Sequence, residues 1–499
     1  MRWVVAVCLA LAACLATAER ILLVPLDSRP AAGQFAQMIG AMANVEINQP
    51  PYHTLGRFTA PGNPEAILDW LRRQDFSDVS AVVVSTDMIA YGGLIASRTN
   101  EVSYETALRR LKSLEEIRKQ VPQVRFYAFT AIMRLTPTAT RTTAAWRLNL
   151  GRYAELRERY RRDRDPALLN TIRNLQAKIP GYEIQKYEWT RQRNHQIQQA
   201  LVRMTAYNAF DYLILGQDDA QPNGPHVPET EKLRETVSRL GIAGKIYFCE
   251  GIDQHSNVLV SRALLRANDW VPRVRLVYAD EAGKTLIAPY ESKTIEQSLR
   301  DQILASGARP AEPGGGYDYT LFLNTPEHRQ EQFEEFLREL GSEVDQGFPV
   351  SVADVNLGKD GTGDPQLFGA LWENNRMMRL LSYSAWNTAG NTMGTAIPAA
   401  NVYLLSRKIG SDPLRREVAQ REFLLHRFVN DFSYHKYTRP QAYTMVDTST
   451  TGSREETYGL EFEEINNFVK RDLGKQLERT FREQFMGKRF FAGNRQYEL

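Results

Sequence analysis

The chain has 499 residues, of which 43% are hydrophobic and 24% are charged, and its formal net charge is +3. This composition is ordinary for a soluble globular protein, and the length allows two or three domains or one large barrel with insertions. The 62 basic residues are nearly balanced by 59 acidic ones. This balance argues against nucleic acid or an acidic membrane surface as the main partner.

Residues 1–18 are expected to be a signal peptide. Arg2 precedes an apolar run over 3–15, and Ala16-Thr17-Ala18 has the A-x-A pattern of a cleavage site. The run is too short to span a bilayer, so we expect no transmembrane span. The alternatives are a lipoprotein box, with a lipid anchor at Cys14, and an uncleaved anchor. We therefore expect an exported protein, either periplasmic or extracellular.

Between residue 20 and about residue 400, strand-like runs alternate with helix-like stretches, as in chains of βα units. The runs are nearly all apolar, which is typical of parallel strands covered on both faces. A first set lies near 20–27, 80–86, 124–131, 211–217 and 245–250, and a second set near 274–279, 319–323, 349–352 and 379–383. This pattern predicts an α/β fold of mostly parallel strands.

We expect two α/β units that share a cleft, an N-terminal unit over 19–270 and a C-terminal unit over 271–410. The charged, helical pattern that follows predicts a helical extension over 411–499. A single (β/α)8-type barrel with insertions is the alternative arrangement.

The stretch over 141–203 is long, rich in arginine and helical in pattern, and it lies between two predicted strands. A normal βα connection is far shorter, so we interpret this stretch as a helical insertion. One interpretation is a solvated helical hairpin. The other is a lid with substrate-contacting arginines, such as Arg191 or Arg193.

Four apolar runs end in carboxylates. They lead to Asp27, to Asp87, to the pair Asp218 and Asp219, and to Glu250 with Asp253. Open α/β sheets and α/β barrels place their ligand sites at the carboxyl ends of the strands. The sequence therefore predicts one acidic pocket and favours an enzyme.

The adjacent pair Asp218-Asp219 is the strongest catalytic candidate. Neighbouring side chains of a strand point to opposite faces, but Gly216 and the Pro/Asn/Gly-rich sequence around Asn223 allow the backbone to turn. When two carboxylates are held close, one can donate a proton while the other stays charged. The alternatives are an Asx-turn that caps the helix of Glu229 and a structural ion pair.

The segment from Asp87 to Arg98 carries Tyr91 and the paired glycines Gly92 and Gly93 after a strand. Paired glycines allow a ligand to approach the backbone closely. Neither a G-x-G-x-x-G fingerprint nor a Walker loop occurs, so nucleotide binding is not supported. The alternative is a tight turn in which Asp87 caps a helix.

Three Ser-Arg pairs occur in the chain, and they end in Arg29, Arg98 and Arg262. Each lies within a dozen residues after a carboxylate that ends an apolar run. An arginine there can clamp an anionic substrate group or neutralise clustered aspartates. Neutralisation is the simpler interpretation.

A polar segment around Trp386, Asn387 and Asn391 follows the last predicted strand. An indole face beside amide groups suits the recognition of a sugar ring and its hydroxyls. The alternative is a capped strand–helix turn with Trp386 in the core. Two other runs end at Asn324 and Asp354, which are expected to face the same cleft.

Metal binding has little support in the sequence. His226 and His255 each follow an aspartate motif, but no paired-histidine motif occurs, and a hydrogen-bonded loop histidine is the simpler interpretation. A Ser-His-Asp hydrolase is also poorly supported, because the G-x-S-x-G elbow is absent. We predict no metal and no other cofactor.

These motifs resemble a bacterial family known only as domain of unknown function 4127. The matching stretches are 24–30, 87–98, 216–224, 251–262 and 386–394, and they span most of the chain. The family pattern has Asp-Glu after Gly251-Ile252, where this chain has Asp253-Gln254, which weakens the case for a second carboxylate there. The resemblance brings no established activity.

An Asp-Asp pair at a strand exit, with a later Trp/Asn-rich loop, is also similar to the motifs of retaining N-acetylhexosaminidase barrels. This similarity implies that Asp218 orients the acetamido group of a substrate and that Asp219 is the general acid. It is a likeness of short motifs, and a shared fold does not decide function.

The leading hypothesis is an exported carbohydrate-active hydrolase, a glycosidase-like enzyme that uses Asp218 and Asp219 as catalytic residues. The alternatives are a metal-dependent hydrolase with Asp and His ligands and a non-catalytic solute-binding protein. The expected partner is a small-molecule or carbohydrate substrate. The residues expected to bind it are Asp27, Arg29, Asp87, Tyr91, Gly92, Arg98, Asn223, Asp253, Arg262, Asn324, Asp354, Trp386, Asn387 and Asn391.

Overall fold

The computed structural model describes residues 19–449, 454, 457 and 459–499. The expected signal peptide and the lipid-anchor candidate Cys14 lie outside the described residues. In the described part of the chain, no helix is long and apolar enough to cross a membrane.

The first sheet has six parallel strands in the order β2-β1-β3-β4-β5-β6. They are β1 (Arg20–Val24), β2 (Glu46–Asn48), β3 (Val79–Ser85), β4 (Arg125–Ile132), β5 (Tyr212–Gln217) and β6 (Ile246–Glu250). Because side chains alternate between the two faces of a strand, Ile21 and Leu23 enter one core, and Leu22 and Val24 enter another. This is why the runs are apolar throughout.

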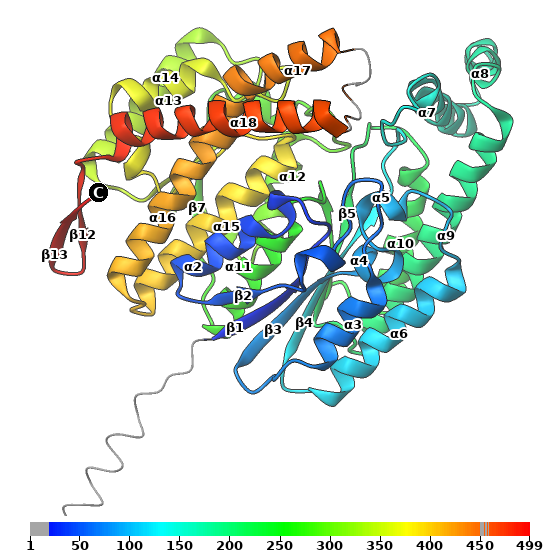
Figure 1. Ribbon diagram of the computed structural model, residues 1–499, viewed down its shortest axis with the longest axis horizontal. Coiled ribbons are helices and arrows are strands. Elements are labelled where there is room, and N and C mark those ends of the chain that lie inside the picture. The colour runs from blue at the N-terminus through cyan, green and yellow to red at the C-terminus, as the bar shows by residue number, and fades with distance from the viewer. Residues whose placement is uncertain (1–18, 450–453, 455–456, 458) are drawn as a thin grey trace, which may run out of the picture.

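Helices cover both faces of this sheet, as Figure 1 shows. On one face lie α2 (Gln34–Met42) and α11 (His255–Ala267). On the other lie α3 (Pro64–Arg72), α6 (Tyr104–Gln120) and the second half of α9 (Gly181–Ala206). Short α4 (Thr86–Tyr91) and α5 (Leu94–Ser97) follow β3, and α10 (His226–Arg239) follows β5.

The second sheet has five parallel strands in the order β11-β10-β9-β7-β8. They are β7 (Arg273–Tyr278), β8 (Arg309–Pro310), β9 (Tyr319–Asn324), β10 (Val350–Asp354) and β11 (Ser382–Ser384). One face is covered by α12 (Ile295–Ala305) and α15 (Ala389–Lys408), and the other by α13 (Gln330–Gln346) and α14 (Pro365–Glu373).

The two units have the same strand order. Counted in chain order within each unit, both sheets begin 2-1-3-4-5, which is the order of flavodoxin-like doubly wound sheets. A single apolar core that includes parts of α2, α11, α12 and α15 contacts both sheets and joins the units. The expectation of two α/β units is therefore confirmed, and the single-barrel alternative is wrong because the strands form two separate open sheets.

The insertion between β4 and β5 is helical, as expected. It consists of α7 (Arg147–Asp163), α8 (Leu168–Gln176) and the first half of α9, which share a small core of their own. Figure 1 shows α7 and α8 at one end of the molecule. Arg191 pairs with Glu229, and Arg193 donates to backbone oxygens at the end of α5 and in the segment that follows it, so both arginines anchor the insertion.

The C-terminal region is helical, with one exception. It contains α16 (Pro413–Phe428), the π-helix η5 (Val429–Thr438), α17 (Arg439–Thr448), α18 (Gly459–Thr480) and the π-helix η6 (Phe481–Phe485). The chain then forms an antiparallel hairpin of β12 (Arg489–Ala492) and β13 (Arg495–Glu498). Figure 1 shows this hairpin at the end of the molecule opposite the insertion.

Candidate functional site

The carboxyl edge of the first sheet gathers the aspartates that follow β1, β3, β5 and β6. Gly93 brings the turn after α4 close to β1, since a side chain there would start 3.2 Å from the Leu26 carbonyl oxygen. Its φ of +124° also favours glycine. Gly216 has a similar role, because a Cβ at this position would lie 2.5 Å from the His255 ring. These glycines let the strand exits pack tightly.

Arg29 joins two of these exits. Its guanidinium lies 2.7 Å from the Asp27 carboxylate and 2.7 Å from the Asp253 carboxylate, which lies 224 residues further along the chain. The Arg29 side chain is 48% exposed, whereas both carboxylates are largely buried. Arg29 therefore forms part of the solvent-facing surface of the site.

Asp218 lies deeper and is held by Arg98. The Arg98 Nη2 donates to Asp218 Oδ2 at 2.6 Å and its Nε donates to the same oxygen at 3.1 Å, while Nη1 donates to Thr138. Next to this pair, Asp87 accepts a hydrogen bond from the Ala131 backbone N–H. Burial raises the pKa of Asp87 to about 7, and the charge of Asp218 adds to the rise.

Of the two adjacent aspartates, Asp218 and Asp219, it is Asp219 that reaches solvent. It forms an ion pair with Arg134, and the two side chains are 28% and 20% exposed. Burial is the largest influence on Asp219 and raises its pKa; Arg134 opposes this rise, and the nearby Asp218 carboxylate adds to it. Asp219 is therefore a candidate proton donor, and it lies next to Asp218, a carboxylate that Arg98 holds in place.

The structure brings these aspartates close to one another at the carboxyl edge of the first sheet, where shared arginines and neighbouring charges connect them. Three guanidiniums, those of Arg29, Arg98 and Arg134, pair with four of the five aspartates and offset part of their negative charge. Arg29 and Arg98 neutralise aspartates, as the simpler interpretation of the Ser-Arg pairs held. Arg134 was not predicted, and its only sequence signal is that it follows the β4 run by two residues.

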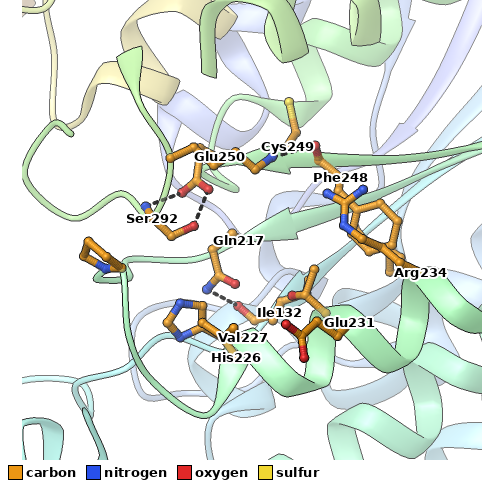
Figure 2. Close-up of a pocket in the computed structure, with 14 residues that line it drawn as sticks. Ile132, Gln217, His226, Val227, Glu231, Arg234, Phe248, Cys249, Glu250 and Ser292 are labelled. Atoms are coloured by element: carbon orange, nitrogen blue, oxygen red, sulfur yellow. Dashed lines mark hydrogen bonds between the residues drawn. The ribbon is translucent and has the colours of Figure 1, made fainter. Parts of the chain in front are cut away.

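A pocket of about 260 Å³ lies beside this cluster, between the ends of β5 and β6 and helix α10. Figure 2 shows Gln217 and Glu250 reaching it from the two strand ends, with His226 and Arg234 on the α10 side. The Gln217 amide donates to the backbone carbonyl oxygen of Asp218 at 2.7 Å. Gln217 therefore links the pocket to the cluster of aspartates and arginines described above.

The two units meet at a pair of buried glutamates next to this pocket. Glu250 accepts a hydrogen bond of 2.6 Å from the Ser292 hydroxyl, and Glu291 accepts one from the Gly390 N–H at the start of α15. Burial and the neighbouring Glu250 raise the pKa of Glu291 to about 8. Asn391 also reaches this junction, with its Oδ1 against Gly251. The apolar stretch over 286–290 precedes Glu291, but it is a strand of neither sheet, and Glu291 was not predicted as a site residue.

Asn324 and Asp354 belong to a second cluster at the carboxyl edge of the second sheet. The Asn324 amide donates to Asp354 at 2.9 Å and to Asp364 at 3.1 Å, and Asn356 donates to Asp364 at 2.9 Å. Burial and the Asp364 charge raise the pKa of Asp354 to about 8. Asp364 also caps α14 through the Gln366 N–H, so this cluster has a structural role.

Several predicted binding residues lie elsewhere. Tyr91 is buried under the Arg193 guanidinium, and Arg262 stacks on Tyr212 at the amino end of β5. The indole of Trp386 is 8% exposed, contacts the Phe35 ring edge-on and donates to Thr395, so it offers little free face to a sugar.

The other predicted positions serve turns and the surface. Gly92 ends α4 with a φ of +97°, and Asn387 is exposed with a φ of +60°. Asn223 accepts a hydrogen bond from the exposed Arg162 of α7.

The histidines do not gather around the aspartates. His226 and His255 are both buried, and burial lowers the pKa of each to about 3. Within the described residues, no group of three or more His, Cys, Asp and Glu side chains is arranged to hold a metal ion.

Comparison with known proteins places the chain in a family. A family model described as "Protein of unknown function (DUF4127)" matches residues 21–498. The chain belongs to the DUF4127 family. This match confirms the resemblance of the sequence motifs and covers both α/β units and nearly all of the C-terminal region. A search of the curated proteins finds no match.

Proposed function

We propose that the protein is a carbohydrate-active hydrolase in which Asp219 donates a proton to the leaving oxygen of a glycosidic bond. The observation that carries this proposal is the unequal environment of the two adjacent aspartates. Asp218 is buried and paired with Arg98, whereas Asp219 reaches solvent and has a raised pKa. Such unequal pairs are typical of sites that divide acid and base roles between two carboxyl groups.

Arg134 supports the proton transfer in this proposal. As the Asp219 proton moves to the leaving oxygen, the glycosidic C–O bond breaks and a carboxylate remains beside the Arg134 guanidinium. The new charge is then stabilised at once by an existing partner. Water then supplies a hydroxyl group to the anomeric carbon and a proton that restores the Asp219 carboxyl group. General acid catalysis of this kind contributes roughly 10²–10⁴-fold to a rate.

The same surface suits the binding of a sugar. The half-exposed Arg29, which the largely buried Asp27 and Asp253 hold in place, offers donors, and the partly exposed Asp219 offers an acceptor. The hydroxyls of a sugar both donate and accept, so a surface that carries both kinds of group suits them. We also propose that the protein acts outside the cytoplasm, on the strength of the signal-peptide pattern over residues 1–18.

A non-catalytic solute-binding protein is the second candidate. It is favoured by the two units of equal strand order, which are joined through a shared core beside the site. In this alternative the Asp and Arg side chains hold a ligand and no bond is broken.

Turnover of a panel of chromogenic glycosides, including N-acetylhexosaminides, tests the proposal. The hydrolase predicts turnover by the wild type, loss of turnover in Asp219→Asn, and no effect of a chelator. Asp345→Asn is the matched control, because Asp345 also pairs with arginines but is an exposed residue in the last turn of α13. Retained ligand binding without turnover in the wild type would favour the solute-binding protein, and loss with chelator would favour a metal-dependent hydrolase.

A further inference from the structure

A second cavity, of about 210 Å³, lies directly behind the Asp218–Arg98 pair. Arg98 forms the wall of this cavity that faces the aspartate cluster. Its Nε and Nη2 donate to Asp218, and its Nη1 donates to Thr138, which also lines the cavity. The other walls come from the segment that leads into the insertion and from α9. The insertion therefore completes a cavity that shares one side chain with the proposed catalytic pair.

The lining of this cavity is rich in hydroxyl groups. Seven threonines line it, including Thr138, Thr140 and Thr143, which form a linked set of hydrogen bonds. A hydroxyl that donates to a backbone oxygen, as Thr143 does to Thr138, still has lone pairs that can accept. Trp146 adds a half-buried indole to the same lining. Hydroxyls beside an aromatic ring match the polar edge and the apolar face of a sugar ring.

The charge of the insertion favours a negatively charged ligand. Residues 141–206 contain 14 Lys and Arg against 6 Asp and Glu, a net charge of +8 in a chain whose total is +3. Lys186, which lines the cavity, forms no ion pair within the described part of the chain, although Glu183 lies one turn earlier in the same lining. An ammonium group without a carboxylate partner is available to an anionic group of a ligand.

We propose that this cavity is a second sugar subsite, which binds a ring carrying a carboxylate or a sulfate through Lys186 and packs it against Trp146. The proposal rests on the proposed function, because it makes the substrate an oligosaccharide that extends from the Asp219 side of Arg98 into the insertion. The substrate class is then an acidic oligosaccharide, either a uronate-containing or a sulfated one.

Binding of the full-length Asp219→Asn protein to an array of neutral, uronate-containing and sulfated oligosaccharides tests this subsite. The expected result is selective binding of one acidic class, with the array distinguishing carboxylate from sulfate. The dissociation constant for the best probe is then measured by calorimetry for Trp146→Ala and Lys186→Gln in the same background. We expect Trp146→Ala to weaken binding by about tenfold or more. Lys186→Gln should remove the preference for acidic over neutral probes.

Trp189→Ala is the matched control, since Trp189 is an exposed tryptophan of α9 that does not line the cavity. It should bind as the parent does. Equal binding by Trp146→Ala and Lys186→Gln, or a preference for neutral probes, would overturn the proposal. Lys186 is partly exposed, so its substitution gives a folded test even if Trp146→Ala unfolds.

The test separates this proposal from the function on which it rests. Hydrolysis of simple aryl glycosides does not require the cavity, so turnover with unaltered oligosaccharide binding by the variants would remove the subsite alone. Binding that depends on Trp146 and Lys186, without turnover of any substrate by the wild type, would remove the hydrolase alone.

Discussion

Arg98 holds the carboxylate of Asp218 at 2.6 Å in a pair whose side chains are 6% and 4% exposed. Removing Arg98 alone leaves a buried carboxylate without its counter-charge, which typically costs about 3–5 kcal/mol. We expect Arg98→Met to lower the free energy of unfolding by an amount in this range, measured by urea denaturation. Asp218→Asn in the same background should recover much of the loss, because the uncompensated charge is then removed.

Arg29 provides the comparison for this prediction. It also pairs with aspartates, but its side chain is half exposed, and water screens such pairs. Arg29→Met should therefore cost about 1 kcal/mol or less. Equal losses for Arg29→Met and Arg98→Met would contradict the assignment of Asp218 and Arg98 as a buried pair.

Stability is expected to fall as the pH rises. Burial raises the pKa of Asp87 to about 7, and those of Glu291 and Asp354 to about 8. A carboxyl group whose pKa is raised by folding binds its proton more tightly in the folded state than in the unfolded state. Its contribution to the free energy of unfolding is therefore complete below about pH 4 and is lost as the pH rises through 7–8. The free energy of unfolding should therefore be lower at pH 8 than at pH 5.

The variants Glu291→Gln and Asp354→Asn should each flatten this dependence, because an amide keeps the shape of the protonated acid and does not ionise. Glu463→Gln, at an exposed position of α18, is the control and should leave the slope unchanged. A slope that is the same in the wild type and both amide variants would contradict the raised pKa values.

The junction of the two units is expected to be sensitive to small changes in volume. A Cβ at Gly390 would lie 3.0 Å from the Glu250 carbonyl oxygen and 3.1 Å from the Glu291 carboxylate. Overpacking of this kind costs about 1–3 kcal/mol, so Gly390→Ala should lower the thermal midpoint. Gly474→Ala is the control: it lies within α18 with no neighbouring atom within 4 Å, and it should stabilise by about 0.5–1 kcal/mol. A stabilised Gly390→Ala would show that the junction is loosely packed.

The sequence predicted the parts of the site that follow strongly apolar strands. The run before Asp218 is buried on both faces, and the exits of β1, β3 and β6 are equally well marked. The equal strand order of the two units could not be predicted, because β2 and β8, which have three and two residues, were not among the predicted strands. A strand of two or three residues is too short to show a clear apolar run.

Trp386 shows why polar neighbours are ambiguous. Its segment was interpreted as sugar-binding because it combines an indole with amides and hydroxyls. In the fold, the Thr388 hydroxyl accepts from the Asn391 N–H as the cap of α15, and the indole packs inward. Helix caps and sugar sites use the same residue types. The sequence alone does not show whether such side chains cap a helix or point toward a ligand. Arg134 and Glu291 were missed because partners distant in sequence give them their roles.

The dependence of the Asp219→Ala defect on the leaving group tests the central claim most directly. A general acid assists a poor leaving group and is not needed for a good one. The account predicts that kcat/KM falls by roughly 10²–10⁴-fold for alkyl glycosides. It predicts only a small loss for 2,4-dinitrophenyl glycosides of the same sugar. Equal losses on both substrates, or full activity on both, would contradict Asp219 as the proton donor.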